Sequence, residues 1–280
     1  MIDGSRSTRN FLLLAPALIS VPSAFSRAVL DGKEYAEHLA RLQRLRGRVY
    51  LEDGAIEHWQ LSKDGRHRLD TDEKSWHLLT VEDEEVVACA RLQLYPETSV
   101  FSELGVARSS QAHCSVWGSI LQQAVTAELH RAQDEQLSFI EAGGWALTPE
   151  LRCTTEALNI ALGSYALGQL LGGCLGLSTA TVRYHSASIL RRLGGSALLW
   201  EGQALPPYFD PEYQCQMEVV RFDSRRPNPK YQFRVDQLQA ELPLARVLCA
   251  VEGLKKPLPC LVSLAKAISP TATTRQPVPL

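Results

Sequence analysis

The chain has 280 residues, 45% of them hydrophobic and 21% charged, which is enough to bury one large core. Its formal net charge of -2 gives no long-range attraction to nucleic acid or to an anionic membrane, and this argues against bulk binding to either. The seven cysteines are scattered, odd in number and without a CxxC pair. The sequence therefore predicts neither a disulfide framework nor a zinc site, and a reducing cytoplasm is the simplest location.

The first segment, residues 1–29, contains an apolar run at 11–21 that Pro16 interrupts and that is too short to span a bilayer. A secretory signal peptide is one interpretation, but residues 23–26 would make a poor cleavage site. We favour a segment that packs against the domain that follows.

Apolar residues recur at helical spacing over 30–45 and again over 112–132, which predicts two amphipathic helices. Between them, two β-type runs at 76–81 and 86–94 flank the acidic turn 82–85 and predict a hairpin. The pattern over 139–195 indicates a strand, a polar turn, a long apolar helix, a second strand and a short second helix.

Two more strands are predicted at 197–200 and 215–222, and a helix at 235–247 precedes a tail rich in Pro and Thr. Strand–helix alternation in the middle of the chain, with hairpins at both ends, predicts an α/β (α+β) fold with a mixed sheet. We expect an N-terminal packing segment at 1–29, a main domain at 30–224 and a C-terminal extension at 225–280 that is frayed at its end.

The polar turn at 148–157 has the spacing of a phosphate cradle. Arg152 comes just before a helix that Thr154 or Thr155 can cap. The free amides and the dipole at such a helix N-terminus favour a bound anion. An ordinary capped helix with a solvated Arg152 is the alternative, and the turn taken alone favours it.

Two motifs resemble those of the GNAT acyltransferase superfamily. Pro149 follows an apolar strand and precedes Arg152-x-x-Thr155-x-Ala157, with Thr where the family usually has its first Gly, and residues 186–195 (SASILRRLGG) resemble the family's second helix. The resemblance implies a mostly antiparallel sheet flanked by helices, splayed at the acyl-donor strands, with acyl-CoA or acyl-ACP as co-substrate and no permanently bound cofactor. It places donor binding at Trp145, Ala146, Leu147, Arg152, Cys153, Thr154, Thr155, Glu156 and Ala157.

A closer resemblance, over residues 30–222, is to the acyl-ACP-using branch, the acyl-homoserine-lactone synthases and N-acyl amino acid synthases. Residues 45–50 resemble the branch's Leu-Arg-x-x-Val-aromatic, and Arg91-Leu92 its second hairpin strand. Residues 141–147 (EAGGWAL) are similar to Glu-x-Ser-Arg-Phe-Ala-Val, but Gly143 and Gly144 replace Ser-Arg, which favours a different amine acceptor. The resemblance places Arg46, Asp70, Asp72 and Arg91 on the acceptor or carrier side.

The implied activity is direct acyl transfer from the thioester to a small-molecule amine, with an acyl carrier protein as a candidate partner and neither nucleic acid nor a membrane span involved. Glu141 is the candidate general base, and the alternative is a strand glutamate that pairs with Arg91 or faces solvent. A bulge amide near 145–147 would meet the oxyanion. Leu190 occupies the position of the tyrosine general acid of many GNATs. For Arg46, Asp70 and Asp72, helix-end and turn-capping roles remain open.

Residues 165–195 also resemble the helix-turn-helix of quorum-sensing response regulators, which would make the protein a DNA-binding transcriptional regulator. Gly172 and Gly173 would then lie inside the first helix, at a cost of about 1 kcal/mol each relative to Ala. The net acidic chain is also poorly suited to duplex binding. A strand at 174–183 would favour acyl transfer, and a helix there would favour DNA binding. The sequence leaves the oligomeric state open.

Overall fold

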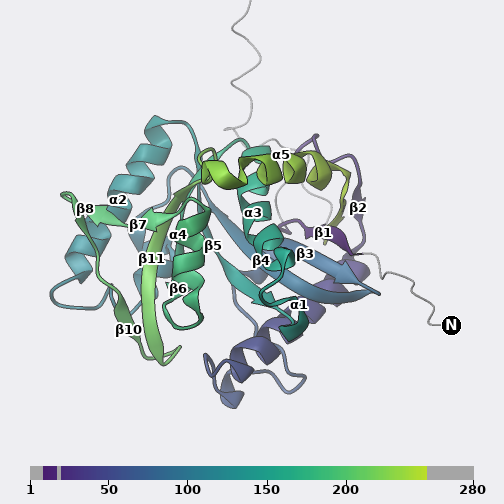
Figure 1. Cartoon of the computed structure of the whole chain (residues 1–280), viewed down its shortest axis with the longest axis horizontal. Coiled ribbons are helices and arrows are strands. Elements are labelled where there is room, and N and C mark those ends of the chain that lie inside the picture. Colours follow the sequence, from purple (N-terminus) through teal and green to yellow (C-terminus); the bar gives the residue numbers. More distant parts are fainter. Residues whose placement is uncertain (1–8, 18–19, 251–280) are drawn as a thin grey trace, which may run out of the picture.

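The computed structural model describes residues 9–17 and 20–250. A large mixed sheet forms the centre of this part of the chain, with the order β10-β11-β6-β5-β4-β3-β1-β12-β2 and β7 beside β11 (Figure 1). Its neighbouring strands are antiparallel except for the pairs β5–β6, β1–β12 and β12–β2. The mostly antiparallel α/β fold expected from the sequence is confirmed.

The strands are β1 Asn10–Leu14, β2 Ala28–Leu30, β3 Trp76–Glu82, β4 Glu85–Tyr95, β5 Ser138–Leu147, β6 Cys174–Thr181, β7 Ser196–Ala197, β10 Tyr208–Asp210, β11 Cys215–Asp223 and β12 Arg246–Cys249, with a separate small hairpin of β8 Leu199–Trp200 and β9 Gln203–Ala204. The α-helices are α1 Gly32–Glu52, α2 Gly118–Asp134, α3 Thr155–Leu170, α4 Ser186–Leu193 and α5 Gln232–Glu241.

Helices cover both faces of the sheet (Figure 1). Alternate residues along each strand point to opposite faces. In β6, Leu175 and Leu177 belong to a cluster with α2, whereas Cys174 belongs to a cluster with α3 and α5. Residues of α1 pack with Leu79 and Cys89 on the same face as α2. The sheet therefore separates an α1/α2 side from an α3/α4/α5 side, and α4 packs against Val220 on the latter.

The first hairpin forms as predicted, with a two-residue turn at Asp83 and Glu84, whose φ angles of 48° and 67° suit a tight hairpin turn. Helix α1 is longer than the predicted 30–45. It begins at an Asp31 cap that accepts from the Glu34 amide at 2.9 Å and ends at Glu52, because the buried stripe continues through Val49.

Both ends of the described chain add strands to the sheet, so the limits expected at 29/30 and 224/225 do not separate it. Strand β1 lies between β3 and β12, and its Leu13 and Leu14 have no exposed surface. The helix predicted over 235–247 ends at Glu241, because Pro243 follows and the chain then enters β12. The frayed tail expected beyond residue 250 lies outside the described residues. Within them, no helix combines the length and apolarity needed to cross a bilayer.

The helix-turn-helix interpretation of 165–195 is wrong, because residues 174–181 form β6, which pairs with β5 on one side and β11 on the other. Gly172 and Gly173 have φ angles of +99° and +90°. They turn the chain out of α3 and into the strand, a conformation that L-residues rarely adopt. What looked like the middle of a DNA-binding motif is thus an interior strand of the sheet.

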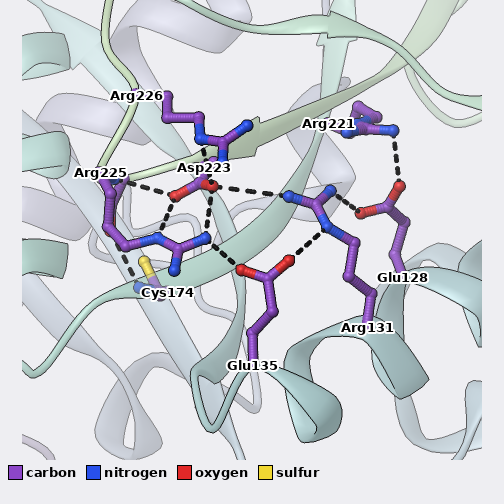
Figure 2. A network of polar contacts seen from close by, with 9 residues as sticks. Glu128, Arg131, Glu135, Cys174, Arg221, Asp223, Arg225 and Arg226 are labelled. Carbon is purple, nitrogen blue, oxygen red and sulfur yellow. Dashed lines mark hydrogen bonds and ion pairs between the residues drawn. The ribbon is translucent and has the colours of Figure 1, made fainter.

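Helix α2 begins at Gly118, later than the predicted residue 112, because residues 112–117 form turns. An ion network ties its last two turns to the end of β11 (Figure 2). Asp223 binds Arg225 through two contacts of 2.9 and 2.7 Å, and Arg131 of α2 reaches both Asp223, at 3.5 Å, and Glu135, at 2.9 Å. Arg221 binds Glu128 at 2.8 Å. The network ties the C-terminal part of α2 to the end of β11.

Candidate functional site

The parallel strands β5 and β6 separate partway along the sheet. Their pairing runs from Ser138 opposite Cys174 to Glu141 opposite Leu177 and then stops, although β5 continues to Leu147 and β6 to Thr181. The edge of β5 beyond Glu141 that faces β6 is therefore not paired with it. Backbone N–H and C=O groups on such an edge are available to an extended ligand.

A bulge in β5 lies beside this opening. Cys89 is opposite Ala146, but Arg91 is opposite Gly143, so two residues of β5, Gly144 and Trp145, face a single residue of β4. Gly144 has a φ of +63°, and its carbonyl accepts a hydrogen bond from the Cys89 thiol at 3.3 Å. The bulge lies beside the predicted oxyanion site at 145–147 and includes Trp145.

The predicted phosphate cradle has the expected local structure. A short 3-10 turn, Pro149–Leu151, leads into α3, and the Thr154 hydroxyl caps the helix by accepting from the Glu156 amide at 3.2 Å. Cys153 has a φ of +60° and is exposed. The Arg152 guanidinium, 41% exposed, pairs with Asp53 at the end of α1 at 3.1 Å. The helix N-terminus is thus free to meet an anion, while Arg152 is partly engaged elsewhere.

Arg46 and Asp72 lie together inside the protein. Arg46 lies six residues before the end of α1, is buried, and donates to Asp72 at 3.0 and 2.7 Å and to the His67 carbonyl at 2.5 Å. Asp72 also accepts from Gln43 at 2.9 Å and from the Leu69 amide at 3.0 Å. Asp72 therefore caps its own turn and also pairs with Arg46. The prediction that Arg46 stabilises the C-terminal end of a helix is wrong, because α1 continues to Glu52.

Burial by itself would raise the pKa of Asp72, but the Arg46 guanidinium and the other donors lower it to about 2. Burial and the positive charge of Arg46 lower the pKa of His67 to about 4. Asp70, two residues before Asp72, is exposed on the loop. The structure brings Arg46 and Asp72 together and leaves Asp70 outside their cluster.

Arg91 of β4 lies next to this pair. Its guanidinium donates to the Thr71 hydroxyl, and burial together with the charge of Arg46 lowers its pKa. A Cβ atom added to Gly143 would lie 3.6 Å from the Arg91 guanidinium, and one added to Gly144 would lie 3.4 Å from that of Arg46. The two glycines thus let the strand approach both arginines closely. We call Arg46, Asp72 and Arg91 the arginine cluster.

Aromatic side chains lie beside the arginine cluster. Tyr50, one turn after Arg46 on α1, contacts the Tyr213 ring at a centroid distance of 6.5 Å and the His67 ring at 5.7 Å. Burial raises the pKa of both tyrosines, and the charges of Arg46 and Arg91 act on both. No sequence signal links Tyr213, which follows β10, to residue 50.

Glu141 is buried and holds the turn at Gly105–Arg108. One of its oxygens accepts from the Gly105 amide at 2.7 Å and from the Tyr95 hydroxyl, and the other accepts from the Val106 amide at 2.7 Å. It neither pairs directly with Arg91 nor points to solvent. A carboxylate has about four acceptor positions, so these contacts leave about one for a substrate proton. The sequence does not point to Tyr95 or Gly105, because they lie 46 and 36 positions before Glu141 in the chain.

No model of a protein family matches the chain, and no curated protein matches it. Solved structures do match. The CoA-dependent acyl-homoserine lactone synthase BjaI with SAM and isopentyl-CoA is 16% identical, with 89% of this chain and 96% of that chain covered and a TM-score of 0.52. The same enzyme with MTA gives the same values. FeeM, an N-acyl amino acid synthase from uncultured soil microbes, is 12% identical, with coverage of 78% and 93% and a TM-score of 0.44.

At 16% identity the match to BjaI is evidence of shared fold alone. The shared fold includes nearly the whole of BjaI, so the resemblance is not confined to a short motif. The chain therefore shares the fold of BjaI, as the sequence resemblance to the acyl-homoserine-lactone synthases implied.

Proposed function

We propose that the protein is an N-acyltransferase that moves an acyl group from a pantetheine thioester, acyl-CoA or acyl-ACP, to a small-molecule amine by direct transfer. The observation that carries the proposal is the separation of β5 from β6 after Glu141, next to the bulge at Gly144 and Trp145. A pantetheine arm is an extended, amide-bearing chain, and the unpaired edge of β5 offers it backbone hydrogen bonds.

On the donor side, we propose that residues 145–147 contact the pantetheine arm and residues 152–157 its phosphate groups. The support is local: α3 begins at Thr155 with a capped N-terminus, and amides of its first turn have no partner inside the helix. The N-terminal end of the helix dipole adds a favourable field for phosphate. A bulge amide at residue 145 would donate to the oxyanion of the tetrahedral intermediate.

On the acceptor side, we propose the arginine cluster together with Tyr50 and Tyr213. Two guanidiniums face one carboxylate there, which leaves one positive charge in excess. A buried excess charge needs a compensating partner, so an amine that also carries a carboxylate fits the cluster best. Gly143 and Gly144 carry no side chain where the homoserine-lactone synthases have Ser-Arg, which supports an acceptor other than SAM.

In the reaction, the neutral amine attacks the thioester carbonyl, a carbon–nitrogen bond forms, and the carbon–sulfur bond breaks to release the thiolate. One proton leaves the amine nitrogen, and the thiolate takes up one proton. We propose Glu141 as the acceptor of the amine proton, through the position that its three contacts leave free. Leu190 stands where many GNATs have a tyrosine general acid, so the thiolate takes its proton from solvent or from another group.

The test is a transfer assay with purified full-length protein. Acyl-CoA and acyl-ACP donors of several chain lengths are each combined with a panel of amines that includes the proteinogenic amino acids, and N-acyl products are measured by mass spectrometry. We expect an amide product that depends on both substrates and falls strongly in Arg91→Met. A panel without any amide product above the heat-treated control would overturn the proposal, and comparing the two donor types identifies the carrier.

A further inference from the structure

The turn that follows α1, Asp53 and Gly54, is joined to the loops after both of the strands that separate at the candidate donor site. Arg152, in the loop after β5, binds Asp53 with 3.1 Å between Nη1 and Oδ1. Arg183, in the loop after β6, donates to the Gly54 carbonyl at 2.9 Å. Because β5 and β6 stop pairing after Glu141, this one short turn links the loops that follow them.

The charge at this end of α1 explains why the turn attracts two arginines. The C-terminus of a helix is the negative end of its dipole, and basic residues are favourable there. The last turn of α1 has no basic residue, and it ends with Glu52 followed by the C-cap residue Asp53. Two carboxylates therefore add to the negative pole, and compensating charge comes from outside the helix, from Arg152 and Arg183.

Two anionic groups would compete for Arg152 during acyl transfer. In the proposed function this residue meets the donor phosphates, and it lies two positions before Thr154, the cap of α3. In the structure its guanidinium pairs with Asp53 instead. The Arg152 side chain is 41% exposed and that of Asp53 is 22% exposed. An ion pair this open to solvent is weak, so a phosphate at the start of α3 can replace the carboxylate.

We propose that Asp53 is a positioning residue that lowers the affinity of the protein for the phosphate of the acyl donor, because it holds Arg152 at the end of α1. This inference rests on the donor side of the proposed function. Donor binding exchanges the contact with the carboxylate for a contact with phosphate, and the carboxylate stays behind as a nearby negative charge. The thiol product keeps the same phosphate, so Asp53 also favours release of the product.

The experiment measures binding to the full-length protein by calorimetry, without an amine. The probes are phosphopantetheine, which acyl-CoA and acyl-ACP have in common, and CoA. Asp53→Asn removes the charge at nearly constant size, and Asp53→Glu keeps the charge. Glu52→Gln is the matched control, because it removes a neighbouring charge from an exposed residue. Asp53→Asn is also made in an Arg152→Met background, to test whether Asp53 acts through Arg152.

We expect Asp53→Asn to bind both probes more tightly, by about two- to fivefold at low salt, which is the range that an exposed ion pair contributes. The gain should shrink at about 1 M salt, where the charges are screened, and it should be absent in the Arg152→Met background. A purely structural role of Asp53 would not depend on salt in this way. Asp53→Glu and Glu52→Gln should bind as the wild type does.

Unchanged or weaker binding in Asp53→Asn would overturn the proposal, as would an equal gain in Glu52→Gln or in the Arg152→Met background. Absence of saturable binding of both probes to the wild type up to about 10 mM would overturn it too. None of these outcomes depends on turnover, so the proposed function fails separately, when the transfer assay gives no amide product.

Discussion

Arg46 and Asp72 form a two-contact ion pair in the interior of the protein, with Nη1 3.0 Å from Oδ1 and Nη2 2.7 Å from Oδ2. The side chains are 1% and 2% exposed. Such a pair adds little to the free energy of unfolding compared with an apolar pair of the same shape. Removing one member, however, leaves the other as a buried charge without a counter-charge. The pair joins α1 to the turn before β3 and so fixes one side of the candidate acceptor site.

Asp72→Asn should therefore be strongly destabilising. We expect the free energy of unfolding, measured by urea titration at pH 7, to fall by about 3–5 kcal/mol, because the Arg46 guanidinium loses its counter-charge. Asp70→Asn is the matched control, since Asp70 is exposed and should change stability by no more than about 0.5 kcal/mol. Equal losses of stability in the two variants would contradict the role of Asp72 as the counter-charge of Arg46.

The same pair predicts a pH dependence. The pKa of Asp72 is lowered from 3.8 to about 2 in the folded protein, so its contribution is fully present above about pH 4 and is lost as the pH falls toward 2. The stability difference between wild type and Asp72→Asn should shrink over that interval. Urea titrations of both proteins from about pH 6 to about pH 2.5 measure it, and a constant difference would mean that folding does not lower the pKa of Asp72.

Gly144 should not tolerate a side chain. Its φ is +63°, and a Cβ atom there would lie 3.2 Å from the Arg91 Cβ atom. Gly144→Ala should lower the free energy of unfolding by about 1–2 kcal/mol for the backbone, with a further loss from the contact. Gly54→Ala is a suitable control, since φ is +62° and nothing lies within 4 Å of the added atom. Thermal unfolding compares the two, and Gly144→Ala should lose more.

Glu141→Gln tests the proton-acceptor role in the transfer reaction. We expect kcat to fall by about 10²–10⁴-fold in single-turnover assays of the purified variant. Tyr95→Phe removes the phenol contact but leaves both amide contacts with Glu141, so it should lower kcat far less. If Glu141→Gln lowers kcat no more than Tyr95→Phe does, Glu141 only positions the turn at residue 105.

The ion network around Asp223 should hold α2 on the sheet. In Asp223→Asn, the two contacts with Arg225 and the contact with Arg131 weaken, and hydrogen exchange of the last two turns of α2 should become faster while that of α3 does not change. Asp134→Asn, an exposed change at the end of α2, is the control. Equal exchange in wild type and Asp223→Asn would show that apolar packing alone holds the helix.

Local patterns determined most of the individual elements. The alternation and the turn residues of 76–94 give the hairpin, because both strands contact each other within the same short stretch. Thr154 caps α3 because its short side chain reaches the Glu156 amide only two residues away. The helix predicted over 235–247 was the least accurate prediction. It ends at Glu241, because Pro243 interrupts it and the residues that follow pair with β1 as β12. Residues 174–181 could be read as strand or helix until their partners were known.

By itself, then, the sequence determined the hairpin at 76–94, most helices and the capped turn before α3, because these depend on residues close together in the chain. The tertiary structure decided what the polar residues do. Arg46 meets Asp72 across 26 positions and Glu141 meets Tyr95 across 46, and no spacing rule specifies such contacts. Only the fold brings these groups together, because burial forces each charge to find a partner wherever the packed elements place one.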